Sequence, residues 1–248
     1  MSGYTNEAKE YWEDAIKRDD RFTSVGIRYL PECINQRRKE KLYPIIRNII
    51  QQEFSELNGE KVLDAGCGTG VYSEFYGSQG GDVTGVDLSE RAVSFLKTNV
   101  EGNFYQSKLN DLPLGDNLFQ LTHCFSVLYH IVDDSEWQES ISELVRVTKP
   151  GGIIVLRIAW QQDTDSPANH VKHRSINQYL RVLSRENACR LESIHTFNDI
   201  PEYSSLIKIF DRIGLENCQE RLCSWIISGN RFKTNPQQRV AVFRVLKK

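Results

Sequence analysis

The feature that most constrains this chain is a short apolar run that leads into three glycines at alternate positions. Residues 62–70 read Val-Leu-Asp-Ala-Gly-Cys-Gly-Thr-Gly. The apolar half predicts a buried strand, and glycine is favoured where a backbone turns tightly or approaches a ligand closely. A strand that enters such a turn and then a helix is typical of the nucleotide-binding edge of a doubly wound α/β sheet.

The rest of the central region alternates strand-like and helix-like segments. We expect strands at 61–65, 82–86, 103–106, 119–125 and 153–159, and helices at 71–79, 89–99 and 135–148, the last opening on a capping box at Ser135. This alternation predicts parallel strands with right-handed crossovers. Beyond residue 159 the rhythm breaks. We expect helices at 175–186 and 203–214, then strands at 215–227 and 239–246 that pair antiparallel at the sheet edge.

The predicted fold is therefore α/β, with a doubly wound, mostly parallel, seven-stranded Rossmann-like sheet whose last strand is antiparallel. N-terminal helices and a helical insertion after the fifth strand complete it. We divide the chain into an N-terminal helical cap (1–58), a Rossmann-like core (59–160), a helical lid (161–214) and terminal strands that complete the sheet (215–248).

The spacing of the glycines narrows the choice of nucleotide. A dinucleotide fingerprint needs G-x-G-x-x-G, whereas this chain has G-x-G-x-G with Val71 at the required third position. The pattern of a P-loop is missing altogether. Asp87 ends the next predicted strand, 21 positions after Gly66 (87 − 66). A carboxylate at this offset can accept hydrogen bonds from both hydroxyls of a ribose, although Asp is also a natural helix cap.

Taken together, four motifs resemble those of the class I S-adenosylmethionine-dependent methyltransferases. Residues 64–70 resemble their first motif and 86–89 their second, while 110–119 resemble the loop beside the adenine and 145–152 the approach to the fifth strand. The resemblance covers residues 61–159. It implies S-adenosyl-L-methionine as the cofactor. The regions on either side, which usually choose the substrate in this family, match only in general plan.

The resemblance also implies roles for individual residues. Asp64 is expected to orient the glycine loop and reach the methionine amino group, and Asp87 to hold the ribose. The backbone at Gly66, Cys67 and Gly68 is expected to touch the cofactor. The remaining expected contacts are Leu88, Leu109, Asn110 and Asp111 around the adenine, and Phe125 and Ser126 facing cofactor and substrate. Lys108 stands where many relatives carry an acid. Independently of the resemblance, Arg28 is a candidate to bind the methionine carboxylate, because its guanidinium can donate two parallel hydrogen bonds.

The segment after the fourth predicted strand supplies the candidate catalysts. His130 is the first candidate base, because histidine titrates near neutral pH, although a structural histidine is an alternative. Tyr129 is expected to orient an acceptor or to be a packed aromatic. His170, His173, Lys172 and Arg174 form a basic cluster. It is interpreted either as a solvated loop or as a contact for an anionic substrate. Likewise, the N-terminal aromatics, such as Tyr11 and Trp12, are expected either to close over the cofactor or to pack on the sheet.

Composition and missing motifs limit the substrate. The net charge of −2 gives no bulk attraction to nucleic acid, and residues 125–128 lack the Asn/Asp-Pro-Pro-aromatic tetrad used on nucleobases. No cysteine pair or acidic cluster predicts a metal, and no apolar run predicts a membrane span. We therefore expect a cytoplasmic, metal-independent methyltransferase acting on an oxygen or nitrogen of a small polar metabolite or natural-product intermediate. The alternatives are a non-catalytic S-adenosylmethionine-binding or regulatory module and, less well matched by the glycine spacing, an oxidoreductase.

Overall fold

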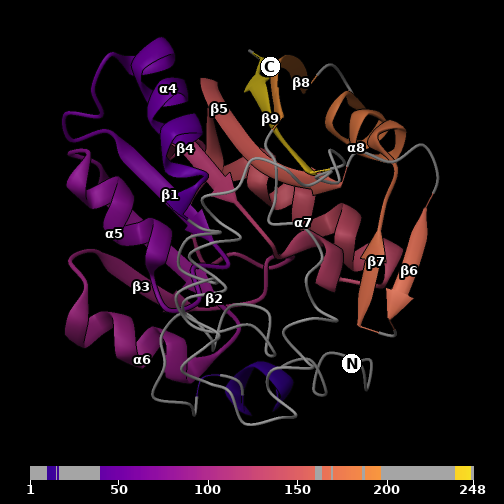
Figure 1. Cartoon of the computed structure of the whole chain (residues 1–248), viewed down its shortest axis with the longest axis horizontal. Helices are drawn as coiled ribbons and strands as arrows, with labels where there is room; N and C mark the ends of the chain where they lie inside the picture. Colours follow the sequence, from indigo (N-terminus) through magenta and orange to yellow (C-terminus); the bar gives the residue numbers. More distant parts are fainter. Residues whose placement is uncertain are drawn as a thin grey trace, which may run out of the picture.

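The computed structural model describes residues 10–14, 16, 40–159, 164–168, 170–185, 188–196 and 238–246. Within these residues, one seven-stranded sheet has the order β3-β2-β1-β4-β5-β9-β8. Its strands are β1 (Lys61–Ala65), β2 (Asp82–Asp87), β3 (Asn103–Gln106), β4 (Phe119–Cys124), β5 (Thr148–Ala159), β8 (Cys189–Thr196) and β9 (Gln238–Val245). β1 to β5 run parallel, and β9 is antiparallel to both β5 and β8. In Figure 1, β8 and β9 lie together near the marked C-terminus.

Helices cover both faces of this sheet. They are α4 (Tyr43–Phe54), α5 (Val71–Ser78), α6 (Glu90–Asn99), α7 (Asp134–Val147) and α8 (Ile176–Leu183), with a short 3-10 turn η1 (Leu128–His130). A separate hairpin of β6 (Asp165–Ala168) and β7 (Val171–His173) stands beside α7 and away from the main sheet (Figure 1).

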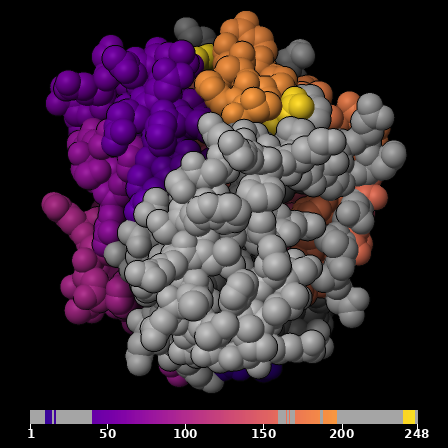
Figure 2. All heavy atoms as spheres, in the orientation of Figure 1, coloured from indigo at the N-terminus to yellow at the C-terminus, as the bar shows by residue number. Residues whose placement is uncertain are grey.

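The alternation of side chains along β5 shows how the two cores form. Ile154 and Leu156 join the core that contains α7 and α8, whereas Ile153 and Val155 join the core that contains α4 and α5. Successive strand residues point to opposite faces, so a strand buried on both sides must be apolar throughout. Val240 to Phe243 of β9 are buried. In Figure 2, the visible spheres of β9 (yellow) lie next to the orange spheres near the top of the view.

The expected strands and helices between residues 61 and 159 are confirmed within a few residues, apart from an earlier start of β5. Two predictions are wrong, one for the segment beyond residue 159 and one for the start of α7. The strand that pairs with β9 at the sheet edge is β8, which lies inside the segment expected to be a helical lid. β9 pairs with β5 on one side and with β8 on the other, and residues 215–227 lie outside the described residues. Also, α7 is capped by Asp133, whose carboxylate accepts from the Ser135 and Glu136 amides, and not by Ser135.

Other expectations lie partly or wholly outside the described residues. The predicted helix at 203–214 and any structure at 215–227 belong to this group, and the four-part division of the chain stays a prediction. Pro44 lies in the first turn of α4, where its missing amide hydrogen costs no helix hydrogen bond. No helix in the described part of the chain is long and apolar enough to cross a membrane.

Candidate functional site

The glycine loop lies at the carboxyl end of β1 and is tied to the end of β2. The Gly66 and Cys67 amides donate to the Val86 carbonyl at 2.8 and 3.0 Å. Gly66, Gly68 and Gly70 have φ of 80°, 52° and 83°, which is the left-handed region. A Cβ on Gly66 would lie 2.2 Å from the Val127 Cγ2. The loop therefore requires glycine at position 66 both for its backbone and for its close approach to the segment after β4.

Asp87 connects this loop to the start of α6. Its Oδ2 accepts from the Gly68 amide at 2.8 Å and its Oδ1 from the Ser89 amide at 2.9 Å. Burial raises the pKa of Asp87, and the two amide hydrogen bonds oppose that rise. Because each carboxylate oxygen has two lone pairs, both oxygens can also accept from a ligand hydroxyl.

Asp64 anchors a buried polar pair beneath the loop. The register of β1 against β4 places Asp64 beside His123, and both side chains face α5. Asp64 Oδ2 accepts from the Ser73 hydroxyl at 2.7 Å, and Oδ1 lies 3.1 Å from His123 Nδ1. His123 is fully buried, as expected of a core histidine. Its Nε2, however, has no hydrogen-bond partner among the described residues.

The other residues expected to contact the cofactor differ in their burial and in their partners. The Cys67 side chain packs with α6 and β3, so its backbone and not its thiol is available to a ligand. Burial raises the pKa of this thiol well above the ordinary value. Leu88 is half-buried, and Leu109 is buried in the core with α7. Asn110 donates to Glu139 of α7 at 3.0 Å, while the Asp111 side chain is exposed.

The end of β4 carries a strained residue. Ser126 has φ of 62°, which is unusual for a residue other than glycine, and its hydroxyl accepts from Arg157 Nη1 of β5 at 3.1 Å. Such backbone strain is concentrated at functional sites. Phe125 is buried, with its ring 3.9 Å from the His123 ring. Arg28 lies outside the described residues. The sequence analysis had no signal for Arg157, Ser73 or the pairing of His123 with Asp64.

His130 ends η1 and contacts the turn before β7. Its Nδ1 lies 3.0 Å from the His170 carbonyl, which can only accept, so Nδ1 carries the proton. Burial lowers the pKa of His130 to about 4, and the His170 carbonyl opposes that shift. The ring is therefore neutral at physiological pH, with Nε2 as its acceptor nitrogen.

Aromatic rings surround His130. The Tyr129 ring lies 4.4 Å from it and 5.4 Å from His173, between ring centroids. From the N-terminal segment, Trp12 contacts His130 at 5.0 Å and Tyr11 stacks on His170 at 5.5 Å. The expected candidates Tyr129 and His130 are thus brought together with the histidines of the expected basic cluster. The glycine loop and Asp87 form the second group, at the same carboxyl edge of the sheet.

The solvated-loop interpretation of the basic cluster is wrong for Arg174. Its side chain is buried and donates to three backbone carbonyls and to Asp134. Among the residues that the structure describes, no group of His, Cys, Asp or Glu is arranged to hold a metal ion.

Comparison with known proteins points to the same kind of domain as the sequence motifs. Residues 63–156 match the model of a methyltransferase domain family, over the same strands, glycine loop and Asp87 that form the site. The matched residues thus contain a methyltransferase domain, in agreement with the resemblance of the sequence motifs. The fold of the chain agrees with that of a magnesium protoporphyrin IX methyltransferase from Synechocystis PCC 6803 with bound SAM. The TM-score is 0.60 at 17% identity, over 100% of this chain and 99% of the other.

Curated relatives are more similar in sequence but match only in part. A malonyl-[acyl-carrier protein] O-methyltransferase of Buchnera aphidicola is 34% identical over 45% of this chain and 44% of its own length. A ubiquinone biosynthesis O-methyltransferase of Proteus mirabilis is 30% identical over 54% of this chain and 56% of its own. The match thus spans about half of the length of these relatives.

The site fits S-adenosylmethionine, the cofactor that the sequence motifs imply. The glycine loop turns at the carboxyl end of β1 with left-handed backbone at Gly66, Gly68 and Gly70, and the Gly68 amide ties it to Asp87. The Asp87 carboxylate, held by two amides, offers two acceptor oxygens at the position expected for a ribose.

Proposed function

We propose that this protein transfers the methyl group of S-adenosylmethionine to an oxygen of a small molecule. The observation that carries the proposal is the Asp87 carboxylate, fixed by the Gly68 and Ser89 amides beside a glycine loop with left-handed backbone. Oxygen is favoured over nitrogen because the curated relatives are named O-methyltransferases. When bound, the cofactor supplies an activated sulfonium methyl group.

The residues of this chain then divide into two roles. Asp87 and the backbone of the glycine loop hold the cofactor. Asp64, whose position is fixed by Ser73 and His123, supports the loop at the methionine end. Ser126, Tyr129 and His130, which follow β4, face the acceptor. Because displacement at an activated methyl depends mainly on alignment, the chief task of the second group is to position the acceptor atom.

His130 is better suited to positioning the acceptor than to acting as a general base. Its Nε2 is an acceptor for a substrate hydroxyl, but a pKa of about 4 makes it a weak base. The lowered pKa also keeps the ring neutral from pH 8 down to about pH 5. Protonation of His130 should therefore produce no fall in rate near pH 6.5, where an ordinary histidine titrates.

The protein should transfer label from methyl-labelled S-adenosylmethionine to a member of a panel of free carboxylic acids, such as malonyl thioesters, and phenols. We expect His130→Ala to lower the rate by about tenfold to a hundredfold, because removing one positioning contact disturbs alignment. Binding of S-adenosylhomocysteine should be unaffected. An unchanged rate in His130→Ala would remove this role.

The assay also separates the alternatives. Binding of S-adenosylmethionine without transfer to any acceptor favours a non-catalytic binding module, and tight binding of NAD in its place favours an oxidoreductase. A cytoplasmic location is proposed as well, because Cys67, Cys124 and Cys189 are buried free thiols, as is usual in a reducing compartment.

A further inference from the structure

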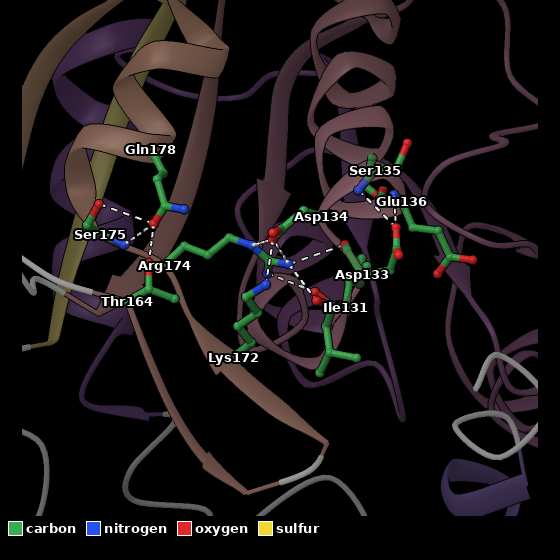
Figure 3. A network of polar contacts seen from close by, with 12 residues as sticks. Ile131, Asp133, Asp134, Ser135, Glu136, Thr164, Lys172, Arg174, Ser175 and Gln178 are labelled. Carbon is green, nitrogen blue, oxygen red and sulfur yellow. Dashed lines mark hydrogen bonds and ion pairs between the residues drawn. The ribbon is translucent and has the colours of Figure 1, made fainter. Parts of the chain in front are cut away.

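Arg174 is the most completely bonded charged side chain near the acceptor end of the site. It follows β7 directly and is 1% exposed. Its Nε donates to the Asp134 carboxylate at 3.0 Å, Nη1 to the Ile131 carbonyl at 2.8 Å, and Nη2 to the carbonyls of Val132 and Asp133 at 3.1 and 3.2 Å (Figure 3). The guanidinium also lies 4.5 Å from the Trp137 ring centroid. A planar fork of five N–H donors can span these acceptors at once, whereas a lysine cannot.

The three carbonyls belong to one short linker. This linker, residues 131–133, joins η1, which ends at His130, to α7, which begins at Asp134. Arg174 therefore holds residues 131–133 by hydrogen bonds, immediately after His130, the candidate acceptor-binding histidine. Arg174 is itself fully buried, so without its guanidinium these three carbonyls would lose their donors, and the linker would have to move to regain partners.

A second contact ties the same two segments together on the other side of His130. The turn before β7 supplies the His170 carbonyl to the Nδ1 of His130 at 3.0 Å, and Tyr129 packs edge-on against His173 at 5.4 Å. Residues 128–134 and 170–174 are thus joined at both ends, by His130 with His170 and by the linker with Arg174. The position of the His170 carbonyl relative to the His130 ring depends on both joints.

We propose that Arg174 is a positioning residue for His130. By holding the linker 131–133 against the end of β7, it keeps His130 Nδ1–H on the His170 carbonyl and so fixes Nε2 as the acceptor nitrogen. The proposal rests on the proposed role of His130 in orienting the methyl acceptor.

Lys172 provides a matched control for the charge of this cluster. It also pairs with Asp134, at 2.9 Å, and its side chain is partly exposed, but none of its hydrogen bonds reaches the linker carbonyls. Lys172→Met therefore removes a cation from the Asp134 carboxylate and leaves the hydrogen bonds between Arg174 and residues 131–133 in place. Arg174→Met removes a cation from Asp134 and also the hydrogen bonds to residues 131–133. Arg174→Lys keeps the charge but loses the planar guanidinium that spans those carbonyls.

The test is nitrogen-15 NMR of the histidine rings in the full chain at pH 7, with S-adenosylhomocysteine binding measured in parallel. In the wild type and in Lys172→Met, His130 should show a single neutral tautomer with a slowly exchanging Nδ1–H. In Arg174→Met this signal should be averaged between tautomers, because the His170 carbonyl no longer holds the proton on Nδ1. Arg174→Lys should be intermediate. The His123 signal, from the pair with Asp64, serves as the internal reference, and S-adenosylhomocysteine affinity should stay within about twofold, as for distant sites.

An unchanged His130 tautomer in a folded Arg174→Met would overturn the proposal. If that variant does not fold, Arg174→Lys decides, because a wild-type His130 signal there would show that the fork is not required. Equal changes at His123 and His130 would also contradict it, since they would indicate general loosening. Loss of the proposed function is a separate result: a wild type that does not bind S-adenosylhomocysteine overturns the function but leaves the His130 signals to be compared.

Discussion

Replacing Asp87 with alanine is expected to weaken S-adenosylhomocysteine binding by about a hundredfold or more. Hydrogen bonds to a charged group contribute about 1.5–3 kcal/mol each, and the carboxylate offers one oxygen to each ribose hydroxyl. The substitution also deprives the Gly68 and Ser89 amides of their acceptor, so the glycine loop loses its tie to β2. Calorimetric titration of the full chain measures the change.

Two further variants make this result specific. Asp87→Asn keeps one acceptor oxygen without the charge and should lie between the wild type and Asp87→Ala. Asp82→Ala makes the same substitution at the exposed start of the same strand and should bind like the wild type. Equal affinity in the wild type and Asp87→Ala would show that this carboxylate does not hold the ligand.

Replacing Gly66 with alanine is expected to lower the free energy of unfolding by about 2–5 kcal/mol and to abolish cofactor binding. A left-handed backbone costs a residue with a Cβ about 1–2 kcal/mol, and overpacking costs about 1–3 kcal/mol more. The overpacking arises because the new Cβ would lie 2.2 Å from the Val127 Cγ2. Denaturant unfolding measures the first effect, and calorimetry measures the second.

Gly59→Ala is the matched control, because Gly59 has a similar φ of 85° and no heavy atom lies within 4 Å of the added Cβ. It should show only the backbone cost and bind normally. In the double variant Gly66→Ala with Val127→Ala, part of the stability should return because the colliding methyl groups are gone. If Gly66→Ala is no less stable than Gly59→Ala, the close approach of the loop to Val127 is not a constraint.

The core of the fold could be predicted from the sequence because its signals are local. The run 62–70 contains its strand, its turn and the start of its helix, and β1 and β3 have the bounds that the pattern indicates. Asp87 was found because a fixed spacing in sequence becomes a fixed position at the sheet edge. The cap of α7 was misplaced by two residues because Asp133 and Ser135 are both good caps, and only the tertiary structure chooses between them.

The contacts that depend on distant pairing could not be predicted. β8 was missed because its burial alternates only partly, so its place in the sheet depends on β9, which follows more than forty residues later along the chain. The buried pair of Asp64 and His123 follows from the register of β1 against β4. Likewise, nothing in the sequence around Arg174 shows that its guanidinium turns inward to residues 131–133. The basic cluster therefore suggests only a solvated loop or a contact for an anionic substrate.

The central claim is that the carboxyl edge of β1, β2 and β4 holds S-adenosylmethionine through Asp87 and the glycine loop. The most direct measurement is a crystal structure of the full chain with S-adenosylhomocysteine. We predict that both ribose hydroxyls donate to the Asp87 carboxylate, with the thioether sulfur on the side of Ser126 and His130. A ligand bound elsewhere on the chain, or a ribose held without Asp87, would contradict it.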